Sequence, residues 1–138
     1  MSSLSNPLRC SLIISVCLLA TLSSYARQTA PGTKTVQLIV DYHDGVEKHF
    51  TRLPWSAKMT VLDAMKKAAR VSHGIQFQYQ GTGATAFLTQ IDDLKNQGGG
   101  KNNWLYAVNR KPAQQSFGVQ ELKPNDMIRW TFHNGSNN

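Results

Sequence analysis

Cysteine is scarce in this 138-residue chain, which has only two, Cys10 and Cys17. Both lie ahead of an expected cleavage site after Ala26, so the mature chain has no thiol. Disulfides, a cysteine nucleophile and cysteine metal ligands are therefore excluded from it. A lipid anchor on Cys17 is also disfavoured, because the branched Val16 stands directly before it.

Long hydrophobic runs are missing too. The apolar stretch at residues 11–22 is shorter than the ~20 residues that a membrane-spanning helix requires. It follows a polar start that carries Arg9 and precedes the small-x-small sequence Ser24-Tyr25-Ala26, and this order is typical of a secretory signal peptide. We expect a secreted or periplasmic protein with no stable membrane insertion. Its predicted parts are residues 1–26 (signal peptide), 27–35 (disordered lead), 36–133 (domain) and 134–138 (tail).

Acidic residues are the minority, with 8 Asp and Glu against 15 Lys and Arg. One of the 15 is Arg9, so the mature chain keeps 14 basic residues and a net charge of +6. The cations are scattered, with no block of five or six, which is typical of a solvated basic surface. Nucleic acid is not an expected partner, because binding it requires a concentrated basic stripe with stacking aromatics.

The mature chain has the length of one domain and alternates strand, helix and turn patterns. Asp44-Gly45 predicts a tight turn between the first two strands. Thr60 and Asp63 form a capping-box pattern that starts a helix, and Gly74 is predicted to cap its C-terminus. Strands are predicted at residues 36–42, 46–53, 75–80, 86–91, 104–109 and 127–133. This order indicates an α+β fold in which a sheet packs on one helix.

The predicted helix has one apolar face. Its stripe consists of Val61, Leu62, Met65, Ala68, Ala69 and Ser72. Lys66, Lys67 and Arg70 point away from that stripe. The small Ala68 and Ala69 predict close packing of the helix on the sheet.

Two glycine-rich stretches resemble nucleotide-binding motifs without meeting their requirements. Residues 81–86 match G-x-G-x-x-A, yet a strand pattern follows in place of the helix that would hold a pyrophosphate. Gly98-Gly99-Gly100-Lys101 lacks the first glycine of a phosphate loop, and Asn102 stands where Ser or Thr would bind magnesium. The first stretch is interpreted as a turn. The second is either a mobile connection or a rim where a ligand approaches the backbone.

Metal binding and catalysis are both disfavoured. In a tight hairpin, His43 faces Val46 and His49 faces Val40, so the histidines do not converge. Asp92-Asp93 lacks the further oxygens of a calcium loop and is interpreted as a turn. The patterns G-x-S-x-G and H-E-x-x-H do not occur. We therefore expect no enzyme, no metal site and no cofactor.

The C-terminal half carries the most specific pattern. It consists of the runs FLTQIDDLKNQGGGKNNWLYAVNRKP (87–112) and SFGVQELKPNDMIRWTF (116–132). These runs resemble the small domain at the C-terminus of transcobalamin and intrinsic factor, which also occurs alone in exported bacterial proteins of unknown function. The most specific residues are Trp104, Tyr106, Val108, Asn109, Lys111, Pro112, Gly118, Leu122, Pro124, Asp126, Ile128 and Trp130. One departure is Arg110, where the family's hairpin usually has Gly after the Asn.

The resemblance covers residues 36–132 and implies a β-grasp fold, a mixed sheet on one helix. In the vitamin carriers this domain caps a corrinoid that a separate helical barrel largely holds, and this chain contains no such barrel. The resemblance therefore implies a face for a flat, largely apolar ligand such as cobalamin, or for a partner protein that holds one.

The expected ligand contacts are Gly98, Gly99, Gly100, Asn102, Asn103, Trp104 and Tyr106. Trp104 and Tyr106 share one face of their strand with Val108, opposite Leu105 and Ala107. If the large residues face the helix, they belong to the core, which a gain of roughly 1.5 to 3 kcal/mol per buried side chain favours. If they face outward, they contact the ligand beside the glycine loop.

Two functions follow from these observations. The first is an exported, non-catalytic binding module for a small ligand such as a corrinoid, held by the glycine loop and adjacent strand ends. The second is a protein interaction module that docks on an envelope or extracellular partner through a sheet edge or its basic surface.

Overall fold

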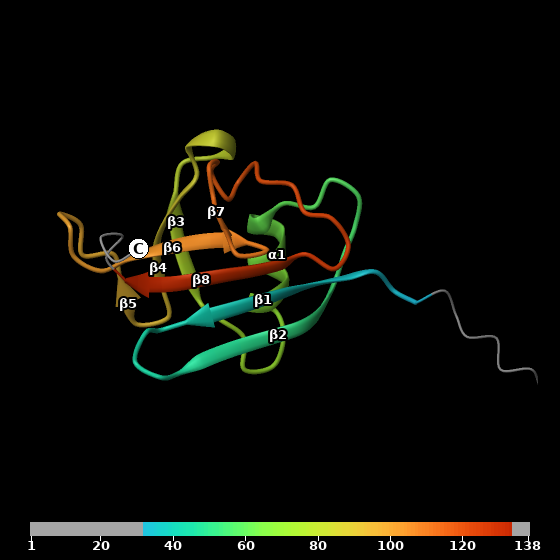
Figure 1. Cartoon of the computed structure of the whole chain (residues 1–138), viewed down its shortest axis with the longest axis horizontal. Helices are drawn as coiled ribbons and strands as arrows, with labels where there is room; N and C mark the ends of the chain where they lie inside the picture. Colours follow the sequence, from blue (N-terminus) through green and yellow to red (C-terminus); the bar gives the residue numbers. More distant parts are fainter. Residues whose placement is uncertain (1–31, 134–138) are drawn as a thin grey trace, which may run out of the picture.

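The computed structural model describes residues 32–133. The expected signal peptide, most of the lead and the tail lie outside the described residues. The strands are β1 (Thr35–Asp41), β2 (Glu47–Pro54), β3 (Phe77–Gln80), β4 (Phe87–Ile91), β5 (Leu94–Lys95), β6 (Asn103–Val108), β7 (Lys111–Pro112) and β8 (Met127–His133). The helices are α1 (Val61–Ala69) and the short 3-10 helix η1 (Gly83–Thr85) (Figure 1).

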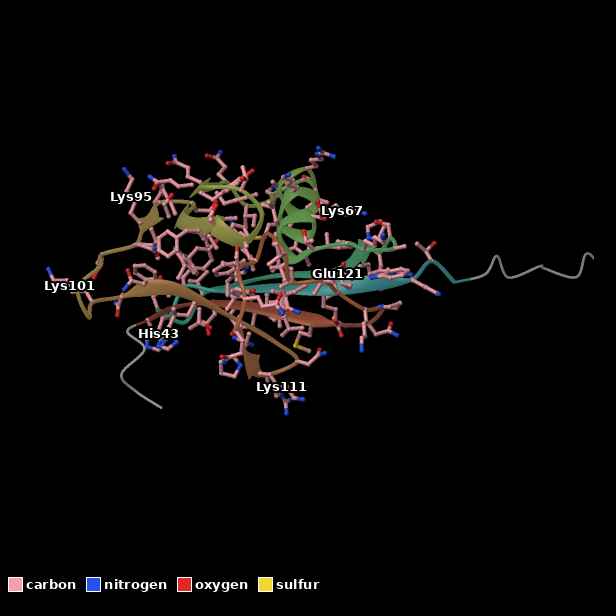
Figure 2. All side chains as sticks on the ribbon, turned by 90° about the horizontal axis from the view of Figure 1, so that it is seen from above. His43, Lys67, Lys95, Lys101, Lys111 and Glu121 are labelled. Atoms are coloured by element: carbon pink, nitrogen blue, oxygen red, sulfur yellow. The ribbon has the colours of Figure 1, made fainter. Side chains whose placement is uncertain are left out.

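The strands form two sheets. The larger has the order β2-β1-β8-β6-β7, with β1 and β8 parallel and the other neighbours antiparallel. The smaller has the order β3-β4-β5 and is antiparallel. Figure 2 shows α1 and the smaller sheet on the same side of the larger sheet. The predicted α+β fold, a mixed sheet packed on one helix, is confirmed, whereas the separate second sheet was not predicted.

The core lies between the larger sheet and the layer formed by α1 and the smaller sheet. The buried side chains of the parallel pair are Val36, Leu38 and Val40 on β1 and Ile128, Trp130 and Phe132 on β8. From α1 they are Val61, Ala64, Met65 and Ala68. Ala69, which was predicted to pack on the sheet, is exposed. Of the two alanines that were predicted to pack on the sheet, only Ala68 is therefore buried.

The start of α1 follows the prediction and its end does not. Thr60 and Asp63 form the predicted capping box, each side chain accepting from the other's backbone N–H. The prediction that Gly74 caps the helix is wrong, because Arg70 is the C-terminal cap. A Cβ at Gly74 would lie 2.3 Å from the Ala68 carbonyl oxygen, so close packing requires glycine there.

No helix in residues 32–133 has the length and apolar character needed to cross a bilayer.

The loop between β1 and β2 is longer than the predicted two-residue turn. The strands' first pair is Asp41 with Glu47, and the Tyr42 N–H donates to the Val46 carbonyl at 3.1 Å inside the loop. Val46 therefore does not face His43 across a tight turn. The Asp41 carboxylate accepts from the His43 N–H at 2.9 Å, and such local bonds compete with ladder pairing.

The longer loop shifts the register of the hairpin. His49 lies opposite Ile39, so the predicted pairing of His49 with Val40 is wrong. His43 adopts a positive φ of 61° and its ring lies near that of His133, with centroids 6.0 Å apart. The histidine contact across the fold was not predicted.

The turn between β6 and β7 keeps its tight geometry despite its sequence. Val108 pairs with Lys111, which leaves Asn109 and Arg110 as the two central residues. Both have positive φ, 51° and 66°, as a tight two-residue hairpin turn requires. Because Arg110 carries a Cβ, its left-handed conformation is strained.

Candidate functional site

A groove lies between the larger and the smaller sheet. β5 pairs with β4 only at Gln90 and Ile91 and does not extend along Phe87 and Leu88. The groove lies between that part of β4 and the middle of β6, with a volume of about 290 Å³. Its lining consists of Ala86, Phe87, Leu88, Trp104, Leu105, Tyr106, Pro112, Ala113, Gln115, Ser116, Phe117 and Trp130. None of these side chains is charged.

Three aromatic residues, Tyr106, Phe117 and Trp130, form an aromatic cluster in the groove. The rings of Tyr106 and Trp130 are 4.8 Å apart and tilted by 35°, and Phe117 meets Trp130 edge to face at 5.5 Å. The Tyr106 hydroxyl donates to the Gln115 carbonyl at 2.6 Å. Burial raises the pKa of Tyr106 to about 12, so the phenol is neutral at physiological pH. The cluster is thus an apolar surface with fixed geometry.

Two large apolar side chains of the groove are exposed. Phe87 on β4 is 60% exposed, and Leu105 on β6 is 42% exposed. Exposed apolar residues at a concave surface are typical of ligand or partner contacts. We call Phe87 and Leu105 the rim of the groove.

Trp104 is a wall of this groove and part of the core. It is 4% exposed, and its indole N–H donates to the Leu94 carbonyl at 2.8 Å. Its backbone N–H donates to the Asn96 side-chain oxygen, while the Asn96 amide donates to the Leu88 carbonyl. Asn96 therefore bridges β6 and β4. Of the two orientations considered for this strand, the structure has the large residues facing inward, with Tyr106 only half-buried.

The glycine loop, Gly98–Gly100, has positive φ at each glycine, 67°, 52° and 74°. The Lys101 N–H donates to the Gly98 carbonyl at 2.9 Å, and the Asn103 side chain accepts from the Gly98 N–H. The Asn102 carbonyl accepts from Gln97. In Figure 2 the labelled Lys101 lies at one end of the molecule. A Cβ on any of the three glycines would have no neighbour within 4 Å, so the loop faces open space.

The structure separates the predicted contact residues into two groups. Trp104 and Tyr106 line the groove. Gly98, Gly99, Gly100, Asn102 and Asn103 belong to the loop that precedes β6 and are not part of that lining. A ligand role for the loop stays a prediction.

A polar cluster fixes the β1–β2 loop against the rest of the fold. The Asp92 carboxylate accepts from the Tyr42 hydroxyl, from Lys48 Nζ at 3.0 Å and from the Gln76 N–H at 2.9 Å. Burial alone would raise the pKa of Asp92, but these three donors outweigh it and the pKa is lowered. Burial and Asp92 together raise the pKa of Tyr42. Asp92 thus has a structural role in the predicted turn.

Ion pairs occupy the sheet face that α1 does not cover. Arg129 pairs with Asp41 at 3.0 Å and with Glu47 at 2.7 Å, and His49 also contacts Glu47. Within residues 32–133, no three His, Asp or Glu side chains converge as a metal site would require. The charged groups of this face therefore satisfy one another.

Sequence reasoning missed the residues that close the groove. Phe117 and Ser116 lie in a connecting segment without periodicity, and Phe87 was assigned only to a strand. The Ser116 hydroxyl donates to the carbonyls of Ala86 and Gly83 and so fastens this segment beside β4. These contacts span about thirty positions, and local patterns carry no signal for them.

Residues 59–134 match the family described as "Domain of unknown function (DUF4430)". The match spans more than half of the chain and includes every residue of the groove lining. A search of curated proteins finds no match.

Two solved structures share the fold. One is a candidate metal-binding protein from Ruminococcus gnavus ATCC 29149, with 14% identity and a TM-score of 0.59 over 74% of this chain and 98% of that one. The other is haptocorrin in complex with Cbi, with 19% identity and a TM-score of 0.56 over 72% of this chain and 25% of that one. At these identities the likeness shows the fold alone. It confirms the predicted resemblance to the C-terminal domain of the transcobalamin family.

Proposed function

This chain belongs to the DUF4430 family, and we propose that it is an exported, non-catalytic binding module whose groove between β4 and β6 takes a small, flat, largely apolar ligand. The observation that carries this proposal is the groove itself. It has a volume of about 290 Å³, an uncharged lining and the aromatic cluster. Ligand sites in proteins are typically concave and apolar with a few polar groups.

A corrinoid such as cobalamin is the first ligand to test. Support comes from the fold shared with haptocorrin, whose structure contains Cbi. This chain corresponds to only 25% of haptocorrin, so any affinity here depends on the groove and its surroundings. The glycine loop, with Asn102 and Asn103, enters the proposal as an outer contact for a ligand too large for the groove alone.

The sequence of residues 1–26 supports export. The side chains that line the groove support binding without catalysis. The groove lining contains no His, Asp, Glu, Lys or Cys side chain that could act as a base or nucleophile. Its hydroxyl groups, on Tyr106 and Ser116, both donate to backbone carbonyls. The groups present suit shape recognition and hydrogen bonding.

The test is a titration of the mature chain, beginning at Arg27, with cobalamin. Tryptophan fluorescence and thermal shift report the binding, since Trp104 and Trp130 line the groove. Saturable quenching with a raised unfolding temperature is the expected result. The variant Phe87→Ala removes an exposed rim side chain and should weaken binding without loss of fold.

Val71→Ala is the matched control for that variant. Val71 is also an exposed apolar residue, at 44%, but it lies beyond the end of α1 and not in the groove lining. Its removal should leave the affinity unchanged. Absence of any response at high micromolar cobalamin removes the corrinoid from the proposal. If both substitutions weaken cobalamin binding equally, the groove is not the binding site.

A second candidate function is docking on a protein partner. The observation that favours it is the edge position of β2 in the larger sheet, together with a net positive charge. Exposed strand edges can pair with another chain. Retention of an acidic envelope or extracellular protein that weakens with salt supports this function. Retention that salt does not affect contradicts the electrostatic part of it.

A further inference from the structure

The backbone of β6 has two sides with different partners. Leu105, Ala107 and Asn109 turn their backbone groups toward β8, as the bond from the Asn109 N–H to the Met127 carbonyl at 2.8 Å shows. In a strand, the N–H and C=O of one residue point the same way and alternate along the chain. The backbone groups of Trp104 and Tyr106 therefore point to the opposite side, where the groove lies.

Two of the four backbone groups on that side have partners. The Trp104 N–H donates to the Asn96 side chain at 2.8 Å. The Tyr106 carbonyl accepts from the Ala113 N–H at 3.1 Å. The Trp104 carbonyl and the Tyr106 N–H form no hydrogen bond with any residue in the described range 32–133. One acceptor and one donor thus face the groove, on either side of Leu105.

These two groups have the spacing that one residue of a neighbouring strand uses. In a parallel pair, a residue donates its N–H to the carbonyl on one side of the facing residue and accepts from the N–H on the other side. Binding by strand addition uses the same bonds between main chains. The Trp104 carbonyl and the Tyr106 N–H can therefore hold one amide-linked unit, with Leu105 as the facing residue.

We propose that the groove recognises ligands through two successive secondary amides, with the Tyr106 N–H donating to the carbonyl of one and the Trp104 carbonyl accepting from the N–H of the other. The inference rests on the proposed function, because it names the chemical class of ligand for that same groove. The ligand's apolar substituent lies beside Leu105, because facing residues of two paired strands put their side chains on the same face of the sheet. A second donor, the Trp130 indole N–H, is buried at the groove without a partner in residues 32–133.

The neighbours of the two free groups limit the size of the unit. The Asn96 side chain fills the next position at one end, and Ala113 fills it at the other. A strand that paired with more than one residue of β6 would displace them. The side chain beside this substituent is the apolar, 42% exposed Leu105, so an apolar substituent gains burial there and a charged one does not. The expected unit is one uncharged, apolar residue with an amide on each side.

The probe for the test is N-acetyl-leucine N-methylamide, which carries one such unit. Its matched control is the analogue in which an ester oxygen replaces the N–H of the acetyl amide, so that only the donor to Trp104 is lost. Binding to the mature chain is followed by amide NMR. The Tyr106 N–H should shift saturably and exchange more slowly with solvent on addition of the probe. The Val108 N–H, which faces Lys111 in the hairpin, is the internal reference.

The ester analogue should bind about tenfold more weakly, as expected from the loss of one hydrogen bond. Equal affinity of the two probes, or saturable binding with an unmoved Tyr106 N–H, overturns the inference. Cobalamin binding that leaves the Tyr106 N–H unmoved also overturns it while supporting the proposed function. If the probe binds and cobalamin does not, the amide site is supported and the corrinoid is excluded as the ligand.

A longer probe distinguishes the two sources of such amides, a free small molecule and an extended segment of a protein. A seven-residue uncharged peptide centred on leucine is compared with the single capped residue. Equal affinity, with the Tyr106 shift, supports a free small molecule, because Asn96 and Ala113 prevent further pairing. Tighter binding of the peptide with the same shift supports an extended segment of a protein. A peptide that binds without moving the Tyr106 N–H contradicts the amide site.

Discussion

The Asn96 side chain accepts a hydrogen bond from the Trp104 N–H at 2.8 Å and so holds the start of β6. The same side chain donates to the Leu88 carbonyl at 2.7 Å, which fixes the separation of β6 and β4. The groove exists because a side chain, and not another strand, spans this gap. The separation of the two sheets at this point therefore depends on Asn96 and on the Trp104 indole, which donates to the Leu94 carbonyl.

Asn96→Ala should destabilise the protein by about 2 kcal/mol, because a group left without its partner costs roughly 1 to 3 kcal/mol when it is buried. Urea denaturation of the mature chain measures the change. Gln97→Ala is the control, since Gln97 is exposed and, within residues 32–133, its hydrogen bond is donated by its backbone N–H. If both variants have the same stability as the parent chain, Asn96 does not hold the sheets together.

Asp92→Asn should lower stability by about 1 to 3 kcal/mol at neutral pH, since it weakens charge-assisted bonds from Lys48 and Tyr42. The pKa of Asp92 is lowered in the folded protein. Its contribution is therefore present above the ordinary carboxyl pKa of about 3.9 and is lost as the pH falls through the folded value.

Denaturation curves at a series of acidic pH values test this sign. The parent chain should lose more stability than Asp92→Asn as the pH falls, so that the two curves converge. Asp93→Asn, at the exposed neighbouring residue, should behave like the parent. Parallel curves for the parent and Asp92→Asn would show that Asp92 has no lowered pKa.

Arg110→Gly should stabilise the protein by about 1 kcal/mol. The left-handed conformation of a residue with a Cβ costs roughly 1 to 2 kcal/mol, and the greater freedom of glycine in the unfolded chain offsets part of the gain. Arg110→Ala keeps the Cβ and the strain, so its stability should match the parent. Thermal unfolding measures all three proteins. A loss of stability in Arg110→Gly would mean that the Arg110 side chain contributes more than its strained backbone costs.

Gly99→Ala separates the glycine loop from the groove. The φ of 52° makes alanine strained there, although its Cβ would meet nothing, so the loop should rearrange. Binding of cobalamin, which would extend beyond the groove, should weaken. Binding of N-acetyl-leucine N-methylamide should not change, because the probe is confined to the groove. Unchanged affinity for both ligands would remove the loop from the site, and weakened affinity for both would place the loop at its centre.

Much of the fold could be predicted because its signals are local. The Thr60–Asp63 capping box, the alternation in β8 and the turn at Asp92 involve residues within a few positions of one another. The predictions were wrong where contacts between residues distant in the sequence determine the local structure. Gly74 is required by its approach to Ala68, and the register of β2 follows hydrogen bonds inside a loop that the dipeptide Asp44-Gly45 does not reveal.

The groove was only partly predictable. The alternation in β6 correctly grouped Trp104 with Tyr106, and burial energy favoured the inward orientation that the structure has. The other walls come from β4 and from the connection after β7, about thirty residues apart in sequence. The gap itself results from the short length of β5, which has two residues and left no recognisable strand pattern. A site formed by the end of one strand beside another has no local signature.

The most direct test is an amide chemical-shift map of the mature protein titrated with cobalamin and, separately, with N-acetyl-leucine N-methylamide. At least one ligand should bind saturably, with its shifts concentrated at residues 86–88, 104–106 and 112–117. No shift with either ligand, or shifts confined to residues 98–103 or to β2, would contradict the claim that the groove between β4 and β6 is where this protein binds.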